Sequence, residues 1–402
     1  MKKSKLIAII IIVALISSIA TFTLSSFFEV KYDDKVIIST DRYESLTHLE
    51  KKYEKTERLE DFINENYYKE VPIEQIQEGV LHGLFQSLDD PYSTYMNEEQ
   101  FEDFNEQSTG TYGGIGIIVT AGKGDFITIV SPIEDTPGEA AGLKSGDKII
   151  EANGIEVFSE TMDDAIDIMK GEPNTDVTLK IKRGQEIFDV SITRELIVLK
   201  SVKSRVVDNY GVLRITMFDN KVSDEFDENM KNLLDENIEG LIIDLRNNPG
   251  GSLSEVVEIA DKILGEQLIV YTQTRDGIQD KYSSGPSKID LPMTVLVNEG
   301  SASASEILTG AIQDSESGVV IGTNTFGKGL VQSVMPLNDG TGFKLTTSQY
   351  FTPSGRYIHD VGIEPDITIE LPEAYFELED PTDQDDVQLQ KAIEILENLW
   401  FL

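Results

Sequence analysis

The second half of the sequence predicts an α/β fold built around a mainly parallel sheet. Two apolar, strand-like runs are each followed by a turn and an amphipathic helical pattern. GLIIDLR at residues 240–246 precedes a helix at 253–264, and MTVLVN at residues 293–298 precedes a helix at 304–313. More strand-like runs occur at residues 268–272, 319–322 and 343–350. Strands that alternate with helices favour parallel pairing, because each helix carries the chain back to the same end of the sheet.

The composition excludes several classes of function. The chain has 402 residues, a length that predicts two to three domains. Its formal net charge of −38 excludes nucleic acid as a partner, because a polyanion would be repelled. It has no cysteine, so disulfide bonds, thiolate catalysis and cysteine-ligated zinc are excluded together.

The first thirty residues predict a membrane anchor. Three lysines within the first five residues precede an uncharged run from Leu6 to Leu24. A helical run of about nineteen such residues is long enough to cross the ~30 Å hydrocarbon layer of a membrane. Because basic residues stay on the cytoplasmic side, we expect residues 1–30 to form a cytoplasmic stub and a single-pass signal anchor in the cell membrane, with the bulk of the chain extracytoplasmic. A signal peptide cleaved after Ser-Ile-Ala at residues 18–20 is the alternative.

Residues 31–109 predict a helical region. From Leu46 onwards, apolar residues recur at helical spacing with charged residues between them. A second helix starts at Pro72, a favoured first-turn residue, and stops before the turn DDP at residues 89–91. We interpret this region as a helical cap on the next domain, with an oligomerisation or anchoring arm as the functional alternative.

Residues 110–194 change to short β-like runs around one helical pattern at residues 162–169. Within them, the line AGLKSGDKIIEANG at residues 141–154 resembles a PDZ domain. That resemblance implies a site for the C-terminus of another protein, in which loop amides surround the terminal carboxylate and the next strand pairs with the peptide. A purely structural β-domain with a glycine-rich turn is the alternative. The expected peptide-binding residues are Gly113, Gly114, Ile115, Gly116 and Ile117.

Three serines alternate with alanines where the strand at residues 293–298 turns into the next helix. Backbone N–H groups at a helix start lack intrahelical partners and favour negative charge, so this position suits the stabilisation of an oxyanion. Ser303 and Glu306 also match the S-x-x-E capping box, which gives a purely structural alternative. Spacing alone does not separate Ser303 from Ser301 or Ser305.

A serine nucleophile needs a base, and Lys328 is the candidate. The three histidines, His48, His82 and His359, are all distant in sequence from a nucleophile-like turn, so a Ser-His-Asp triad has little support. Lys328 lies between two glycines and precedes the apolar run LVQSVMPL, which predicts a strand that carries the amine into a dry interior. The pKa of a lysine base must fall from about 10.4 toward 7, at a cost of about 4 kcal/mol. Gln332 follows four residues later, with an amide that can orient the amine.

A nucleotide-binding reading of the same segment is disfavoured. GTNTFGKG at residues 322–329 approaches the phosphate-binding pattern G-x-x-x-x-G-K-[ST], but Gly329 stands where the Mg²⁺-binding hydroxyl belongs. A strand rather than a helix is also predicted to follow. An ATP-binding protein that uses Lys328 is therefore the weakest hypothesis.

The combination of GSASASE with GKGLVQ resembles the carboxy-terminal processing peptidases, also called tail-specific proteases. The resemblance covers residues 43–370. It implies Ser303 as nucleophile, Lys328 as general base and Gln332 as the residue that positions the lysine. It also implies a crotonase-like or ClpP-like α/β core at residues 195–371, with the PDZ domain inserted before it.

The resemblance also implies an oxyanion hole. The loop NNPGG at residues 247–251 joins a predicted strand to a predicted helix, a geometry that suits anion binding. The implied donors are the backbone N–H of Gly251, with Gly250 as the alternative, and the backbone N–H of Ala304. A tight structural turn would need the same glycines.

These inferences combine into a main hypothesis of a bacterial envelope serine endopeptidase that captures apolar C-terminal tails through its PDZ domain and needs no metal or organic cofactor. Lys170 and Arg183 are both candidates for a basic residue that couples tail binding to activity. The alternative is a catalytically inactive PDZ scaffold that binds protein C-termini at the cell surface.

Residues 372–402 predict an acidic linker and an amphipathic helix. The predicted apolar face of this helix comprises Leu389, Ala392, Ile393, Leu396, Leu399 and Trp400. Such a stripe needs a cover, either the N-terminal helices or a second copy of the same element. Because terminal arms often mediate dimers in the resembling family, we predict a homodimer.

Overall fold

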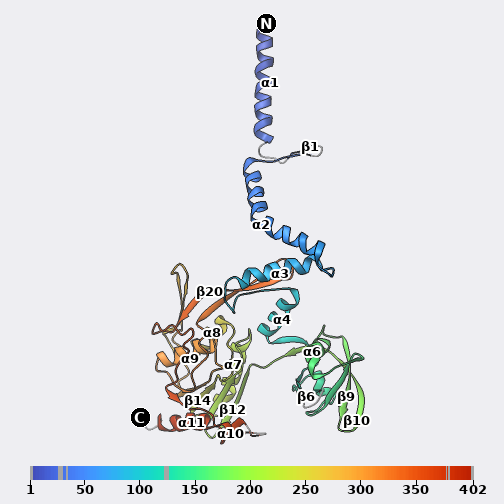
Figure 1. The fold of residues 1–402 in the computed structure, drawn as a ribbon. Helices are drawn as coiled ribbons and strands as arrows, with labels where there is room; N and C mark the ends of the chain where they lie inside the picture. The colour runs from blue at the N-terminus through green and yellow to red at the C-terminus, as the bar shows by residue number, and fades with distance from the viewer. Residues whose placement is uncertain are drawn as a thin grey trace. The chain divides into compact units, whose positions relative to one another are not determined.

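The computed structural model describes residues 3–25, 30–32, 35–121, 126–376, 378 and 381–399 (Figure 1). The chain divides into two compact units, Met1–Leu84 and Phe85–Leu402. The finer division predicted from the sequence, with boundaries after residues 30, 109, 194 and 371, remains a prediction.

The first unit is largely helical. Its elements are α1 (Lys3–Ser25), the antiparallel hairpin of β1 (Val30–Tyr32) and β2 (Lys35–Ile37), α2 (Thr40–Asn66) and most of α3 (Ile73–Gln86). Ser39 caps α2 by accepting a hydrogen bond from the Arg42 N–H at 3.2 Å. In the described ranges, no helix combines the length and the apolar character that a membrane crossing requires. The transmembrane anchor predicted for residues 1–30 therefore gains no support.

The region predicted as a PDZ domain has its own sheet and its own core. The strand order is β10-β9-β7-β6-β5, so β5 lies at an edge. Its core consists mainly of β-branched and leucine side chains, among which Ile127, Ile149 and Leu179 are fully buried. Its elements are β4 (Thr111–Gly114), β5 (Ile117–Ala121), β6 (Ile127–Pro132), α5 (Pro137–Ala140), β7 (Lys148–Ala152), β8 (Ile155–Glu156), the 3₁₀ turn Ser159–Thr161, α6 (Met162–Met169), β9 (Asp176–Arg183) and β10 (Glu186–Thr193).

The C-terminal part contains the predicted parallel sheet, in the order β12-β13-β14-β17-β18-β21. Every pairing in it is parallel except that of β12 with β13, so the prediction of a mainly parallel sheet is confirmed. Its strands are β12 (Val202–Val207), β13 (Tyr210–Ile215), β14 (Gly240–Asp244), β17 (Met293–Val297), β18 (Val319–Gly322) and β21 (Ile367–Thr368).

Helices cover both faces of this sheet. On β14, Leu241 and Ile243 pack in one core with α7 (Val222–Asp235), α8 (Leu253–Leu264) and α9 (Ala304–Asp314). The intervening Ile242 packs in a second core with α11 (Val387–Leu399). Because alternate residues of a strand point to opposite faces, α11 covers the face opposite to α7, α8 and α9.

Of the later strand-like runs, residues 319–322 join the parallel sheet, whereas residues 268–272 and 343–350 do not. A second, antiparallel sheet runs β16-β15-β20-β19, and β3 pairs with β20. The short turn between β19 and β20 permits only antiparallel pairing, which fixes the direction of both strands. The strands are β3 (Thr94–Met96), β15 (Leu268–Thr274), β16 (Gln279–Ser283), β19 (Leu330–Pro336) and β20 (Gly342–Phe351).

The prediction of which surface covers the apolar face of the C-terminal helix is wrong. Leu389, Ala392 and Leu396 are fully buried against the parallel sheet of the same chain, so neither the N-terminal helices nor a second copy is needed. The homodimer prediction thereby loses the observation on which it was built. Trp400, which was placed on the same face, lies outside the described residues, and α11 ends at Leu399.

Two further helices and one strand complete the described part. Asn97 caps α4 (Glu98–Thr109), and Gly110 ends it in the left-handed conformation. β11 (Glu195–Val198) pairs antiparallel with β4, and α10 (Glu373–Phe376) is a single turn. β4 and β11 thus join the two ends of the PDZ-like region.

Candidate active site

Ser303 lies where the buried strand β17 leads into α9, as predicted. Its backbone has φ +55° and ψ −112°, a combination that non-glycine residues rarely adopt and that surrounding contacts must hold. Its N–H donates to the Glu306 carboxylate at 2.9 Å, and its carbonyl oxygen accepts the Tyr350 hydroxyl at 3.1 Å. Ser303 and Glu306 thus form the predicted capping contact at the start of α9.

The structure separates the three serines, which spacing alone did not. The Ser301 hydroxyl donates to the Leu245 carbonyl at 2.8 Å, and the Ser305 hydroxyl donates to the Asn248 carbonyl at 2.9 Å. Both of these serines are fully buried. Only the half-buried Ser303 lines the large cavity of this region, so it is the serine that a substrate can reach.

Glu306 does more than cap the helix. Its carboxylate is fully buried and accepts N–H hydrogen bonds from Ser303 at 2.9 Å, Gly327 at 2.7 Å and Lys328 at 2.9 Å, and the Thr325 hydroxyl at 2.6 Å. One side chain of α9 therefore fixes the loop that carries Lys328. The sequence pattern indicated only its capping role, because the other donors are distant in sequence.

Lys328 lies in the loop before β19, not on the strand. Its half-buried amine is 4.7 Å from the centroid of the Tyr92 ring. Burial lowers the pKa of Lys328 below its usual value, and the nearby Lys344 ammonium lowers it further, against the opposing effects of Asp90 and Glu306. Ser303 and Lys328 line the same cavity, but no hydrogen bond joins their side chains within the described part of the chain.

Gln332 lies on β19, at a bulge in its pairing with β20. Its amide donates to the Thr346 hydroxyl at 3.3 Å, and in the ranges that the structure covers it forms no hydrogen bond with the Lys328 amine. The two side chains nevertheless line one cavity, so the predicted positioning role remains a prediction.

The two predicted oxyanion donors face the same cavity. The Gly250 N–H is already used, because it donates to the Asn248 side chain at 2.9 Å. By contrast, the N–H groups of Gly251 and Ala304 donate to no protein group in the described residues. Asn248 brings the two donors together, because its carbonyl oxygen accepts the Ala302 N–H at 3.0 Å. Between Gly250 and Gly251, the structure therefore favours Gly251 as the free donor.

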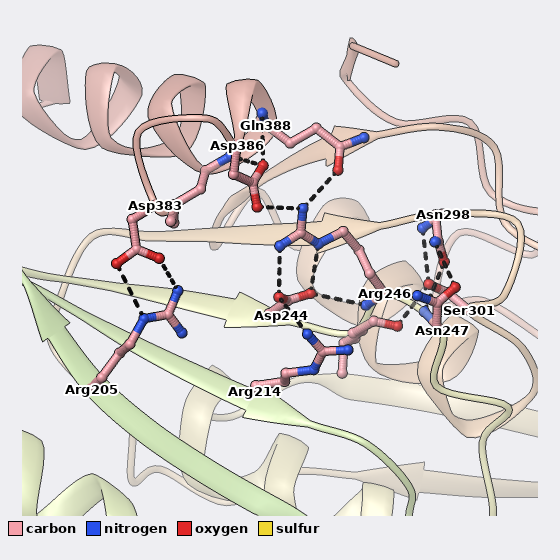
Figure 2. Close-up of polar contacts among 12 residues, drawn as sticks. Arg205, Arg214, Asp244, Arg246, Asn247, Asn298, Ser301, Asp383, Asp386 and Gln388 are labelled. Carbon is pink, nitrogen blue, oxygen red and sulfur yellow. Dashed lines mark hydrogen bonds and ion pairs between the residues drawn. The ribbon is translucent and has the colours of Figure 1, made fainter. Parts of the chain in front are cut away.

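A buried ionic cluster supports the loop that carries Gly251. Figure 2 shows the Arg246 guanidinium between Asp244 and Asp386, with an ion pair of 2.8 Å to each. Gln388 accepts a further hydrogen bond from Arg246 at 2.9 Å. Asp244 and Arg246 thus have a structural role, and they tie the end of β14 to the start of α11.

A second contact joins the two loops beside this cluster. The Asn247 N–H donates to the Asn298 side-chain oxygen at 2.8 Å, and the Asn298 amide donates back to the Asn247 side chain at 2.9 Å (Figure 2). The loop after β14 and the loop after β17 are therefore held side by side. This pairing places the candidate oxyanion loop next to the candidate nucleophile.

The cavity has a volume of about 530 Å³. Polar groups line one part of it, among them Ser303, Lys328 and Gln332, while the remaining walls are largely apolar. The apolar walls include Phe104, Phe218, Leu253, Ile307, Leu330, Val331 and Val334. The arrangement combines a candidate nucleophile, a base and oxyanion donors with room for an apolar peptide segment.

The predicted peptide-binding loop divides into two parts. Gly113 and Gly114 belong to β4 and pair with β11, so they are not free loop residues. Ile115 and Gly116 form the loop before β5, and their N–H groups donate no hydrogen bond to the described residues. Gly116 has φ +72°, and a Cβ there would lie 2.4 Å from Thr136, so glycine is required. Ile117 then begins the edge strand β5.

The two candidate basic residues have different partners. Arg183 forms a bidentate pair with Asp147 inside the PDZ-like region, with both distances 2.7 Å. Lys170 instead reaches α4, where its amine lies 3.3 Å from Asp103 and 3.0 Å from Glu106. Only Lys170 therefore contacts an element that lines the cavity.

Comparisons with known proteins match three stretches of the chain to known families. Residues 209–369 match the model of peptidase family S41, residues 128–183 match the PDZ domain, and residues 14–100 match the N-terminal domain of the activating protease CtpB. A carboxy-terminal-processing protease of Bartonella bacilliformis is 38% identical over 320 residues, which cover 77% of this chain and 73% of that protein.

Two further relatives add to the comparison. A protein of Staphylococcus aureus named probable CtpA-like serine protease is 37% identical over 322 residues, which cover 79% of this chain and 65% of the relative. The chain thus spans slightly less than two thirds of that relative's length. A solved structure from Bacteroides fragilis, assigned to the S41 proteases, has a TM-score of 0.56 at 16% identity, with 83% of this chain and 92% of that chain covered. This last likeness concerns the fold alone.

Proposed function

Because the chain belongs to peptidase family S41, the carboxy-terminal processing proteases, we propose that it is a serine endopeptidase with Ser303 as nucleophile and Lys328 as general base. One observation carries the proposal. Ser303, Lys328 and Gly251 all line one cavity. Ser303 has a rarely adopted backbone conformation, the pKa of Lys328 is lowered, and the Gly251 N–H donates to no group of the described residues. A lowered pKa increases the fraction of Lys328 that is neutral at a given pH, and a general base must be neutral to accept a proton.

The acylation step follows from these groups. The neutral Lys328 amine takes the hydroxyl proton of Ser303 while the oxygen attacks the scissile carbonyl carbon. The carbonyl electron pair becomes an oxyanion, which the N–H groups of Gly251 and Ala304 stabilise. When the tetrahedral intermediate collapses, the C–N bond breaks and the Lys328 ammonium gives its proton to the departing amine. Water then hydrolyses the ester, with Lys328 acting again as the base.

The proposal requires one movement. In the described conformation the Lys328 amine lies on Tyr92 and forms no hydrogen bond with Ser303 within the covered ranges. A lysine side chain has four rotatable bonds, so the amine can turn toward Ser303 when a substrate is bound. Gln332, on the adjoining strand, supplies an amide oxygen for the amine in that position.

We propose that the PDZ domain selects substrates with apolar C-terminal tails. The edge position of β5 and the free N–H groups of Ile115 and Gly116 support this reading, because a tail can pair with the strand while its carboxylate meets the loop. A fluorescent peptide with a free C-terminal carboxylate should bind. The same peptide with an amidated C-terminus should bind at least tenfold more weakly, and equal binding would contradict the assignment.

We also propose that the protein works outside the cytoplasm. The three lysines before the uncharged run that starts at Leu6 support export by this N-terminal segment. Protease added to intact cells whose outer wall is permeable should digest the catalytic region. Full protection from digestion until the cells are lysed would exclude the proposed location.

A fluorophosphonate probe tests the enzymatic proposal against an inactive PDZ scaffold. The probe should label the wild-type protein on Ser303, as identified by mass spectrometry. Ser303→Ala should not be labelled, and both Ser303→Ala and Lys328→Ala should fail to cleave protein while they still bind tails. An unlabelled wild-type protein that still binds tails would favour the inactive scaffold. Label on Ser301 or Ser305 would show that this serine, and not Ser303, is the nucleophile.

A further inference from the structure

Tyr92 lies beside the proposed base, although it is distant from it in sequence. It belongs to the turn between α3 and β3, and the centroid of its ring is 4.7 Å from the Lys328 amine. We infer that Tyr92 is a positioning residue for the general base, whose ring holds the Lys328 amine in the cavity and sets the pH at which that amine loses its proton. The inference rests on the proposed function of Lys328.

The turn that carries Tyr92 is fixed to the sheet of the active site. Within it, the Tyr92 N–H donates to Asp90 at 2.9 Å, and the Ser93 hydroxyl donates to the second Asp90 oxygen at 2.5 Å. The Thr346 N–H of β20 then donates to the Ser93 hydroxyl at 2.9 Å. β3 continues this attachment by pairing with β20. The ring therefore has a defined position relative to β19 and β20.

The other neighbours of the ring are also defined. The His359 ring packs against it, with centroids 6.4 Å apart at an angle of 64°, in an edge-to-face arrangement. The backbone around His359 packs closely on the lysine loop, because a Cβ at Gly329 would lie 2.8 Å from the His359 nitrogen. Tyr92 is thus held between the lysine loop and the chain segment at His359.

An aromatic face distinguishes the two protonation states of an amine. Its negative quadrupole attracts an ammonium ion and has little attraction for a neutral amine, and the effect strengthens where water is excluded. The Tyr92 ring therefore favours the protonated form of Lys328, as do the carboxylates of Asp90 and Glu306, while burial and Lys344 oppose them. This stabilisation belongs to the described conformation, in which the amine lies on the ring, and it acts on the protonation of Lys328 before the amine turns toward Ser303.

The acidic limb of the pH–rate profile tests this role. In Tyr92→Leu, which keeps an apolar side chain and so excludes water, the limb should move to lower pH by roughly one unit, since a cation–π contact in a dry site shifts the pKa by that order. Tyr92→Phe keeps the ring and should leave the limb in place. A merely structural role would change the maximal rate without moving the limb.

The readout is the pH dependence of both peptide cleavage and fluorophosphonate labelling. Tyr357→Leu is the matched control, because its ring packs on His359 but not on Lys328, and its limb should stay at the wild-type pH. If Tyr92→Leu does not fold, fluorinated phenylalanines at position 92 replace it. They weaken the ring quadrupole at nearly constant shape and should lower the limb in steps with the number of fluorine atoms.

The outcomes separate this inference from the proposed function. A wild-type protein that neither reacts with the probe nor cleaves peptides would overturn the serine peptidase proposal itself. An active wild-type protein with an unmoved limb in Tyr92→Leu and in the fluorinated series would overturn the role of Tyr92 alone. A limb that moves to higher pH would overturn it as well, because the ring would then favour the neutral amine.

Discussion

The backbone N–H of Lys328 donates to the buried carboxylate of Glu306 at 2.9 Å. Glu306 belongs to the helix that starts beside Ser303, whose N–H meets the same carboxylate oxygen. One carboxylate therefore sets the distance between the backbone of the candidate nucleophile and that of the candidate base. The position of the base depends on this contact as much as on the lysine itself.

Glu306→Gln should disrupt both stability and activity. A glutamine amide offers one acceptor oxygen in place of two, and its NH₂ group would face backbone N–H donors. We expect the free energy of unfolding to fall by at least about 2 kcal/mol, because hydrogen bonds to a buried charged group are lost. Urea unfolding and cleavage rate give the two measurements. The control is Glu299→Gln, an exposed residue bonded to the Thr323 hydroxyl, which should be neutral. Equal stability of the two variants would contradict this role.

Lys344→Met should move the acidic limb of the pH–rate profile to higher pH. Burial is the first cause that lowers the pKa of Lys328, and the positive charge of Lys344 is the second. Without that charge the Lys328 ammonium persists to higher pH, so at a fixed pH on the limb the rate falls. The groups that remain, Asp90 and Glu306, act in the same direction as the substitution. The exposed Lys288→Met is the control, and a limb that stays in place would refute the coupling.

Gly251→Ala should abolish most of the activity without loss of tail binding. Gly251 has φ +143°, and a Cβ there would lie 2.2 Å from the Phe218 carbonyl oxygen, so the loop must move. Displacement of one oxyanion donor typically lowers the rate by about 10²–10³-fold. Gly277→Ala is the control, because Gly277 also has a positive φ but a Cβ there would meet no close atom, the nearest being the Gln273 side-chain nitrogen at 3.9 Å. Near wild-type turnover in Gly251→Ala would exclude this donor.

Local pattern was sufficient to predict the elements that carry the candidate site. The helix expected at residues 253–264 is α8 with the same ends, and Ser303 stands at the start of α9 as expected. Both predictions rest on a local pattern, in which an apolar strand is followed by a glycine-rich or serine-rich turn and then by apolar residues at helical spacing. The separation of Ser303 from Ser301 and Ser305, however, came only from the partners of their hydroxyls.

Long-range contacts could not be predicted in the same way. Tyr92, which follows the predicted turn at residues 89–91, was not among the predicted site residues, because nothing in the sequence near it indicates Lys328 as a neighbour. The antiparallel sheet depends on which strands pair and in which direction, and the local sequences of β15 and β20 do not show that they are partners. Leu389, Ala392, Ile393 and Leu396 are buried on α11 as predicted, but the surface that covers them was predicted wrongly, because an apolar stripe on a helix does not say which surface covers it.

The buried contact between Arg246 and Asp386 should make the folding of the active-site loop at residues 247–251 depend on the segment that starts α11. Asp386→Ala removes one of the two carboxylates that pair with the buried Arg246 guanidinium. Removal of one partner of a buried ion pair typically lowers the free energy of unfolding by about 3–5 kcal/mol. We expect the melting temperature to fall by about 5 °C or more, and peptide cleavage to fall with it, because Arg246 precedes the loop that ends at Gly251. Differential scanning calorimetry and turnover at a temperature below both transitions give the measurements.

Asp383→Ala is the matched control for this prediction. Asp383 also pairs with an arginine, Arg205, at 2.6 Å, but both side chains are substantially exposed, at 40% and 47% (Figure 2). An exposed pair contributes about 0–1 kcal/mol, so the melting temperature of Asp383→Ala should stay near that of the wild type. Asp386 lies three residues further along the chain and is buried, and it also accepts the N–H groups of Gln388 and Leu389 at the start of α11, at 3.1 and 3.0 Å. If both substitutions lowered the melting temperature equally, burial of the Arg246 cluster would not be what holds α11 against the sheet.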